Sequence, residues 1–252
     1  VALAFLLGSE EIELLGVSVV YGDVATRARL ARRMLRVWGR GQTPVVVGCG
    51  RPLGFAYREG TAPLACSQAA AVADDDEPLD ETLTGPGLIA ESARRWPGRV
   101  VVVTIGAMTN VGVALSAWPW LAEPGRGLAG VVSLAGYAPP RLARPEWNVR
   151  YDPVAARAVA ASGVAWTVVG ADVQGDNGLD RGALDRLASS GGARMALLTR
   201  LMVLMWRHKG GRLEIERIEQ VPAVHVAGVT AVAAAMAPER FDWRRGVVTV
   251  AE

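Results

Sequence analysis

RVVVVTIGAMTNVGVALSAW, residues 99–118, combines the two patterns that decide the fold of this chain. Its first part, Arg99–Thr104, is a near-continuous run of β-branched apolar residues, which is typical of a parallel strand buried on both faces. Its last part, Asn110–Trp118, has the apolar spacing of a helix. In the turn between them, Gly106 permits a tight bend and Thr109 can cap the following helix. The stretch therefore predicts a strand, a turn and a helix in succession.

The same alternation of strand and helix runs along the rest of the chain. Further strands are expected at Ile12–Val20, Pro44–Gly48, Gly130–Leu134 and Val164–Gly170. Further helices are expected at Thr26–Trp38, Pro86–Trp96, Pro153–Ser162, Asp180–His208 with a break at Gly191-Gly192, and Thr230–Met236. This alternation is typical of an α/β fold with a doubly wound, mostly parallel sheet and helices on both faces. Ligands bind beyond the carboxyl ends of the strands in such sheets, so the site residues should follow strands.

Length and composition narrow the classes of protein to which the chain can belong. The 252 residues suit one domain spanning 1–252, and 51% of them are hydrophobic, which is enough for a sizeable core. The longest apolar runs are too short to cross a bilayer. The 27 basic and 25 acidic residues give a net charge of +2, which argues against a dedicated nucleic-acid binder. Two cysteines, Cys49 and Cys66, make no disulfide framework, so a cytoplasmic location is expected.

The first residues have the pattern of an incomplete element. VALAFLLGS, residues 1–9, reads as the second half of an apolar helix that begins before Val1. We therefore expect an N-terminal strand and loop to be missing from this sequence. The segment has no basic region and no cleavage site, so it does not resemble a signal peptide.

Charged segments and histidines have ordinary explanations besides a binding site. DDDEPLDE, residues 74–81, is interpreted as a solvated loop in preference to a metal site, because like charges adjacent in sequence usually spread into water. The arginines of Thr26–Arg40 are interpreted as a solvated helix face in preference to an anion patch, since the acidic and basic totals match. His208 and His225 lie near no serine or cysteine nucleophile pattern, which favours structural roles.

Three groups of residues are candidates for a site. Asp23 follows a strand through Tyr21-Gly22, and it could cap the next helix or face a pocket. The turn at Ile105-Gly106 leaves carbonyl oxygens at a strand end, and hard cations such as calcium take oxygen ligands of this kind. Glu146 and Asn148, in the triplet EWN, should project to the same side of an extended segment. Such a carboxylate and amide suit the hydroxyls of a sugar, and a loop tied down by its own side chains is the alternative.

Taken in order, these motifs resemble the inosine–uridine-preferring nucleoside hydrolase family. The matching stretches, which run from Val1 to about Val250, are LLGSEEIELLGVSVVYGDV, TPVVVGCGRPL, VVVTIGAMTNVGVAL, EWNVRYDPVAARAV and VVGADVQ. The resemblance implies a doubly wound α/β fold, a homodimer or homotetramer, and hydrolysis of the N-glycosidic bond of ribonucleosides to ribose and free base. It also implies a calcium ion that holds the ribose 2′- and 3′-hydroxyls and the attacking water, and an aspartate that takes a proton from that water.

Carried over by position, the resemblance assigns roles to four residues. Glu146 and Asn148 would hold the ribose hydroxyls. Asp23 stands where the family often has an asparagine near the sugar. Ile105 stands where a threonine gives its backbone carbonyl to calcium, and a backbone ligand tolerates this change of side chain.

The chain departs from the family at the catalytic positions. The family motif DxDxGxDD, which supplies most calcium ligands and the base, ends just before the residues that match Val1-Ala2-Leu3. A His-Asp pair near the family's C-terminus falls on Ala227-Gly228, and His225 lies two residues earlier. The catalytic base is therefore left unassigned, with His225 as the candidate for protonating the leaving base. Without carboxylates an oxygen site holds calcium weakly, so the alternative is a degenerate relative that binds a nucleoside or ribose without cleaving it.

Overall fold

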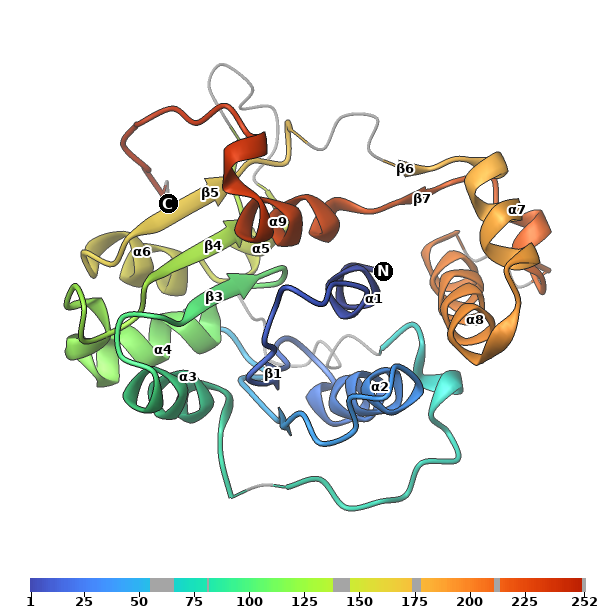
Figure 1. Cartoon of the computed structure of the whole chain (residues 1–252), viewed down its shortest axis with the longest axis horizontal. Coiled ribbons are helices and arrows are strands. Elements are labelled where there is room, and N and C mark those ends of the chain that lie inside the picture. Colours follow the sequence, from blue (N-terminus) through green and yellow to red (C-terminus); the bar gives the residue numbers. More distant parts are fainter. Residues whose placement is uncertain (55–65, 81, 138–145, 174–177, 211–213, 251–252) are drawn as a thin grey trace.

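The structure is a computed structural model that describes residues 1–54, 66–80, 82–137, 146–173, 178–210 and 214–250. Figure 1 shows β3, β4 and β5 side by side with helices around them, and a second group of helices that includes α2, α7 and α8. Helices α1 and α9 lie between these two groups. Among the described residues, no helix is both long and apolar enough to cross a lipid bilayer.

The strands of the described residues form two parallel sheets and one antiparallel pair. They are β1 (Val17–Ser18), β2 (Val45–Val46), β3 (Val101–Thr104), β4 (Gly130–Leu134), β5 (Trp166–Val169), β6 (Gly178–Leu179) and β7 (Val224–His225). β1 pairs with β2 in parallel, β4 lies between β3 and β5 in parallel, and β6 and β7 are antiparallel. All five predicted strands are present. β4 has its predicted bounds, whereas β1 and β2 are much shorter than predicted.

The helices agree with the predicted segments to within a few residues, α1 lies inside the apolar helix expected over residues 1–9, and only α5 is added. They are α1 (Ala2–Leu7), α2 (Val24–Val37), α3 (Gly85–Arg95), α4 (Thr109–Ala117), α5 (Trp147–Tyr151), α6 (Pro153–Ala161), α7 (Arg181–Ser189), α8 (Gly192–Gly210) and α9 (Ala227–Met236). Short 3₁₀ turns lie at Ala69–Ala71, Pro119–Ala122, Ile218–Gln220 and Pro238–Arg240. The break predicted at Gly191-Gly192 is confirmed. These glycines have φ angles of 66° and 78°, which glycine adopts at low cost.

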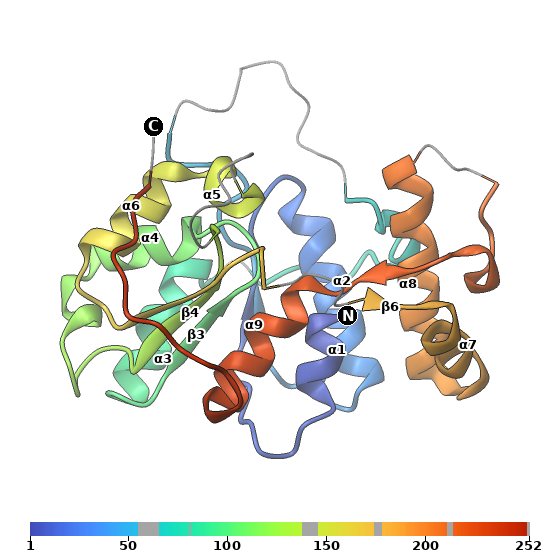
Figure 2. The same ribbon diagram turned by 90° about the horizontal axis from the view of Figure 1, so that it is seen from above.

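The three-stranded sheet is covered by helices on both faces, which confirms the doubly wound fold. On one face, Val131 of β4 packs in an apolar cluster with residues of α3, α4 and α6. On the other face, Val132 and Leu134 pack with Ala231 and Ala234 of α9. Figure 2 shows α3 and α4 on one side of β3 and β4, with α9 on the other. Every residue of β4 is buried because successive side chains point alternately to the two faces of the sheet, and helices cover both faces.

A second apolar cluster joins α2 to the two helices that follow β6. Met34 of α2 and Trp38, which caps its carboxyl end, pack with Leu184 of α7 and with Leu198 and Met202 of α8. These contacts fix the position of α2 from its carboxyl-terminal half. Ala28 and Ala31, nearer its amino-terminal end, pack against Val19 and the residues around β1 and β2.

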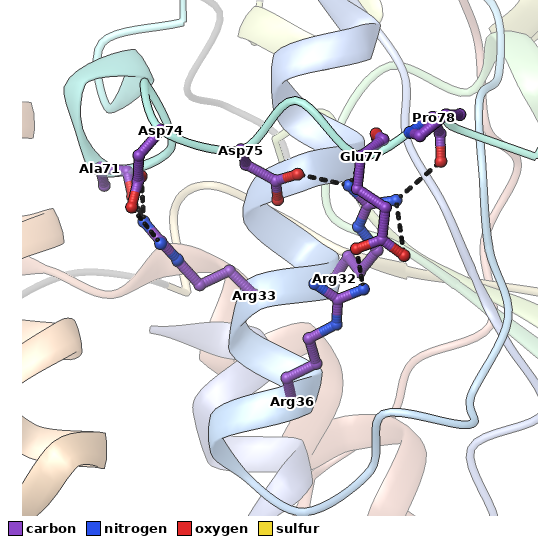
Figure 3. Close-up of polar contacts among 8 residues, drawn as sticks. All are labelled: Arg32, Arg33, Arg36, Ala71, Asp74, Asp75, Glu77 and Pro78. Carbon is purple, nitrogen blue, oxygen red and sulfur yellow. Dashed lines mark hydrogen bonds and ion pairs between the residues drawn. The ribbon is translucent and has the colours of Figure 1, made fainter.

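The acidic loop after the first 3₁₀ turn binds the arginine face of α2 (Figure 3). The ion pairs are Arg32–Asp75 at 2.6 Å, Arg33–Asp74 at 2.9 Å, and Arg36–Glu77. The interpretation as solvated side chains holds for Asp74 and Glu77, which are 73% and 52% exposed, but it is wrong for Arg32 and Asp75. The Arg32 and Asp75 side chains are only 14% and 8% exposed. Each partner lies about forty positions from the other, so no local pattern could reveal the pairing.

Hydrogen bonds from the arginines also change the acidity of this loop. The bond from Arg33 lowers the pKa of Asp74, and the bond from Arg36 lowers the pKa of Glu77. A carboxylate whose pKa is lowered by folding stabilises the fold above its ordinary pKa, and that contribution is lost as the pH falls through the lowered value. Both carboxylates are exposed, so the solvent and salt screen these pairs strongly.

One buried side chain, Asn110 in the first turn of α4, links the two parallel sheets. Its Nδ2 donates to the Val19 carbonyl just after β1 at 2.9 Å, and its Oδ1 accepts from the Cys49 N–H after β2 at 2.8 Å. Two glycines leave room for this amide. A Cβ on Gly48 would collide with Asn110, and a Cβ on Gly85 would lie 2.8 Å from its Nδ2. The Asn110 amide thus connects the ends of β1 and β2 to α4, the helix that follows β3.

A cavity of about 830 Å³ lies between β1 and β3. Its walls include Val17–Val20 from the first sheet and Val100–Val103 from the second. Within the described residues, β1 pairs only with β2 and β3 only with β4. Val101 in β3 is 46% exposed, which is unusual for a valine in a sheet covered on both faces. The two parallel sheets therefore meet through side chains such as Asn110, with open strand edges between them.

Replacing Asn110 with alanine should lower the free energy of unfolding by about 2–4 kcal/mol, because two backbone groups lose their partner at a buried position. Denaturation in urea measures this change. Ser116→Ala, an exposed substitution on the same helix, is the matched control and should stay within about 0.5 kcal/mol of the original chain. A loss for Asn110→Ala as small as that of the control would show that the two sheets are held together by other contacts.

Candidate functional site

The loops after β1 and β2 are tied together at the carboxyl edge of the first sheet. The Tyr21 N–H donates to the Cys49 carbonyl at 2.9 Å, and the Gly22 N–H donates to the Gly50 carbonyl at 2.8 Å. Tyr21 has a φ angle of 77°, the left-handed region that a tyrosine rarely adopts. Such strain persists only where surrounding contacts fix the backbone, and it is common at functional sites.

Asp23 lies directly after this strained turn and caps α2. Its Oδ1 accepts a hydrogen bond from the Thr26 N–H at 3.0 Å, which confirms the capping role that the sequence allowed. Burial alone would raise the pKa of Asp23, but the hydrogen bonds from Thr26 and the charges of Arg27 and Arg29 hold the pKa below its ordinary value. The side chain is half-buried, so capping does not remove it from solvent.

Aromatic rings surround the strained tyrosine. The Tyr21 ring lies edge-on to that of Tyr151, with centroids 4.0 Å apart, and to that of Trp147, with centroids 6.2 Å apart. The Arg27 guanidinium lies 5.3 Å from the Tyr21 ring centroid, and its Nε donates to the Tyr21 carbonyl at 2.7 Å. Trp147 is 59% exposed. The carboxyl edges of β1 and β4 therefore share one aromatic surface, which the sequence analysis did not identify.

The EWN triplet does not form the extended segment that the sequence predicted. Glu146 caps α5, and its two carboxylate oxygens accept from the N–H groups of Asn148 at 2.9 Å and Val149 at 3.0 Å. The Asn148 Nδ2 donates to the Leu134 carbonyl, at the end of β4, at 2.8 Å. Glu146 and Asn148 are both buried, while Trp147 between them points outward. The prediction failed because Glu146 satisfies the free N–H groups of a helix start, which favours a helical turn over an extended chain.

A buried carboxylate that the sequence analysis did not select lies beside these residues. Asp152 is fully buried and caps α6, where its Oδ1 accepts from the Ala155 N–H at 2.9 Å. Its Oδ2 accepts from the Leu53 N–H at 2.9 Å and from the Thr109 hydroxyl at 2.7 Å. Thr109 therefore does not cap α4 as predicted, because its hydroxyl is taken by Asp152. The available signal was the Asp-Pro pair at a helix start, which marks a cap.

Asp152 also affects the cysteine at the end of β2. Burial, together with the negative charge of Asp152, raises the pKa of the Cys49 thiol. A raised pKa keeps the thiol protonated at neutral pH, so Cys49 is not poised as a nucleophile.

The positions that the resemblance assigned to the metal site are neighbours in the structure. A Cβ built on Gly228 would lie 3.2 Å from the Ala2 Cβ and 3.4 Å from the Ile105 Cβ. These side chains offer no oxygen, and the described residues contain no group of three or more histidines, cysteines, aspartates or glutamates that could hold a metal ion. The described residues thus do not fit calcium there, because a lone backbone carbonyl at Ile105 cannot offset the cost of desolvating the ion.

His225 lies in a different part of the fold from the aromatic surface. It is exposed in β7, opposite Gly178 of β6. Its neighbour Val224 packs in the cluster of α7 and α8. Asp23, Glu146 and Asn148, by contrast, all lie at carboxyl ends of parallel strands, and none of them lines the large cavity. The candidate site is therefore the edge of the sheet around Tyr21 and Trp147.

The whole chain, residues 1–252, matches the family described as inosine-uridine preferring nucleoside hydrolase. An uncharacterised protein of Schizosaccharomyces pombe is 30% identical over 66% of this chain, and the match covers 55% of that relative's length. The probable uridine nucleosidase 2 of Arabidopsis thaliana is 26% identical over 97% of this chain, and the match covers 76% of that relative's length. The solved structure of the plant nucleoside hydrolase PpNRh1 matches with a TM-score of 0.74 at 20% identity, over 94% of this chain and 74% of that one. This last likeness supports the fold alone.

Exchanging Asp23 for alanine should lower the free energy of unfolding by about 1 kcal/mol, because the Thr26 N–H loses its acceptor. Asparagine at this position caps almost as well, so Asp23→Asn should cost less than about half as much at neutral pH. Chemical denaturation of both variants measures the two costs. Equal losses would mean that the charge beside Arg27 and Arg29, and not the cap, accounts for the stability that Asp23 contributes.

Proposed function

This chain belongs to the inosine-uridine preferring nucleoside hydrolase family, and from that membership we propose that the protein hydrolyses the N-glycosidic bond of ribonucleosides to ribose and the free base. The observation that carries the proposal is the match of the family over all 252 residues. Relatives named as a uridine nucleosidase and as non-specific ribonucleoside hydrolases support the same substrate class.

Glu146 and Asn148 are the proposed contacts to the ribose hydroxyls. Each carboxylate oxygen has more than one lone pair, so Glu146 can accept a hydroxyl proton while it still caps α5. The bond from Asn148 to the Leu134 carbonyl fixes the plane of the amide. Both side chains are therefore held in place before a ligand arrives, which lowers the entropy cost of binding. Asp23, which follows the carboxyl end of β1, is the proposed third polar contact to the ribose.

The aromatic surface is the proposed neighbour of the nucleobase. Trp147 lies between the two proposed ribose contacts in sequence and is 59% exposed, so its flat face is available to a planar ligand. The Tyr21 ring lies edge-on to the Trp147 ring, with the two ring centroids 6.2 Å apart. Stacking of this kind tolerates different bases, so these residues by themselves do not select purine or pyrimidine.

Calcium assistance and the catalytic base remain predictions from the resemblance. Ile105 is the proposed backbone ligand, but the side chains beside it are apolar, so we assign no step of the reaction to a metal here. His225 remains the candidate for protonating the leaving base. Because His225 is exposed in β7, the loop that carries it must change conformation to bring the imidazole to the ligand. The homodimer or homotetramer and the cytoplasmic location are likewise proposals.

One assay distinguishes a hydrolase from a relative that binds the nucleoside without cleaving it. Release of ribose from uridine and inosine is measured with and without a calcium chelator. Turnover that the chelator abolishes supports the hydrolase and its metal. Saturable binding without turnover, unaffected by the chelator, supports the binding protein.

Replacing Asn148 with alanine should lower kcat/KM for uridine or inosine by at least about tenfold, because a hydroxyl partner is lost at the reacting sugar. Arg150→Ala, on the exposed side of the same helix, is the control and should keep its activity. Thermal unfolding of both variants shows whether the loss of the Leu134 contact has disturbed the fold. An Asn148→Ala enzyme that keeps more than nine-tenths of its activity would overturn the assignment of this residue.

A further inference from the structure

The acidic segment, residues 73–78, is held to the rest of the fold mainly by arginine side chains. Val72 before it is buried, and Leu79 after it packs in the cluster formed by α2, β1 and β2. No apolar side chain of the segment itself is buried. The N–H groups of Asp76 and Glu77 donate to no backbone carbonyl of the described residues. The segment is therefore anchored at its two ends and fastened by charge between them.

The arginines that meet this segment form one face of α2. Four of them are three or four positions apart, a spacing that places side chains on the same side of a helix. They are Arg29, Arg32, Arg33 and Arg36. Arg200 of α8 adjoins this arginine face, because its Nη2 donates to the Ala70 carbonyl at 2.8 Å and Arg33 donates to the next carbonyl, that of Ala71. Two helices thus contribute cations to one surface.

Two contacts show that the arginine face recognises carboxylates (Figure 3). Arg33 donates two parallel hydrogen bonds to the two carboxylate oxygens of Asp74, each 2.9 Å long, and Arg36 pairs with Glu77. The Asp74 side chain is 73% exposed and that of Glu77 is 52% exposed. Exposed pairs of this kind contribute little to stability, so a competing carboxylate can take the place of either one.

A third contact shows that the face also recognises a peptide backbone. The Arg32 Nη2 donates to the Asp75 carboxylate at 2.6 Å and to the Glu77 carbonyl at 3.0 Å. The Arg32 Nη1 donates to the Pro78 carbonyl at 3.0 Å. One guanidinium therefore binds a carboxylate and two carbonyls of the same extended segment. This combination of acceptors belongs to an acidic peptide and favours such a peptide over a nucleic acid as the ligand.

The arginine face has donors that the acidic segment leaves unused. The Nε atoms of Arg29 and Arg32 are buried and have no hydrogen-bond partner among the described residues. A guanidinium offers five N–H donors, and burying one of them without an acceptor is unfavourable. A ligand with more carboxylates than the segment brings to the face would satisfy these cations more completely.

We propose that the arginine face of α2, together with Arg200 of α8, is a binding surface for an extended acidic segment of another protein, and that residues 73–78 cover it as an internal competitor. A segment tethered at both ends has an effective concentration on the order of millimolar at its site. An external peptide therefore binds well only when the internal segment is released or when the peptide carries more carboxylates. The inference does not depend on the proposed function.

The test compares the original chain with two double variants of the same loop. Asp74→Asn/Glu77→Gln, the released variant, weakens the two exposed pairs and leaves the shielded Arg32–Asp75 pair intact. Asp76→Asn/Asp80→Asn, the control variant, removes the same charge at exposed positions that form no ion pair with a described arginine. The probe is a fluorescently labelled peptide of about eight aspartate and glutamate residues, long enough to span the face. A peptide of asparagine and glutamine is its neutral counterpart.

Fluorescence anisotropy should show that the acidic peptide binds the released variant at least about tenfold more tightly than the original chain or the control variant. The neutral peptide should bind none of the three. Adding Arg33→Gln/Arg36→Gln to the released variant should abolish binding, whereas Arg94→Gln/Arg126→Gln, at two other exposed ion pairs, should not. Equal binding by the original chain, the control and the released variant would overturn the proposal.

Two further results would assign the arginine face to a different partner and overturn the proposal. One is binding of single-stranded RNA, but not of the acidic peptide, to the released variant. The other is a dimer of the original chain, seen by size-exclusion chromatography, that the released variant fails to form, because a second copy would then supply the acidic segment.

A measurement on the original chain decides the matter even if the released variant does not fold. The Asp75 N–H donates to the Val72 carbonyl at 3.1 Å, so displacement of the segment should expose this amide. An excess of the acidic peptide should speed amide hydrogen exchange at Asp75 by at least about threefold, and the neutral peptide should not. Exchange that the two peptides leave unchanged, or alter equally, would show that the segment is a fixed part of the fold.

Discussion

The amide of Asn110 is the interaction on which the arrangement of the two parallel sheets depends. It satisfies one backbone group after β1 and one after β2 from a helix that belongs to the other sheet. The neighbouring residue Thr109 binds Asp152, which holds the start of α6 and the loop at Leu53. The first turn of α4 therefore sets the relative positions of the carboxyl ends of the strands. The Asn110 amide occupies the space beside Gly48 and Gly85, so a side chain larger than that of glycine does not fit at either position.

The sequence predicted the elements that are decided by local pattern. The run of valines before Gly106 and the segment at β4 are near-continuously apolar and rich in β-branched residues, so their composition alone identifies them as strands. β1 and β2 were predicted too long, because a strand extends only as far as its partners do, and the edge of β1 that faces the cavity has no described partner. Helix bounds were close because caps such as Asp23 and Asp180 are local signals.

The errors arose where a distant partner decided the conformation. Thr109 is a plausible cap until Asp152, more than forty residues later, takes its hydroxyl. Glu146 turned an expected extended segment into a helix start, and Asn148 reached back to the end of β4. At the candidate site, the same side chains that were selected for a sugar also hold the backbone in place. The two interpretations that the sequence left open are thus compatible, since a carboxylate already fixed by backbone N–H groups is a more rigid partner for a ligand.

The open edges of β1 and β3, as seen among the described residues, have a consequence for the association of one molecule with another. Unpaired strand edges act as templates on which strands of other molecules can add, and natural sheets usually protect them with charge, proline or a covering element. The cavity edge of β3 carries consecutive valines and no charged side chain between Val100 and Thr104. Among the described residues, the edge of β3 is therefore where a strand of another molecule adds most readily while the chain is still folding.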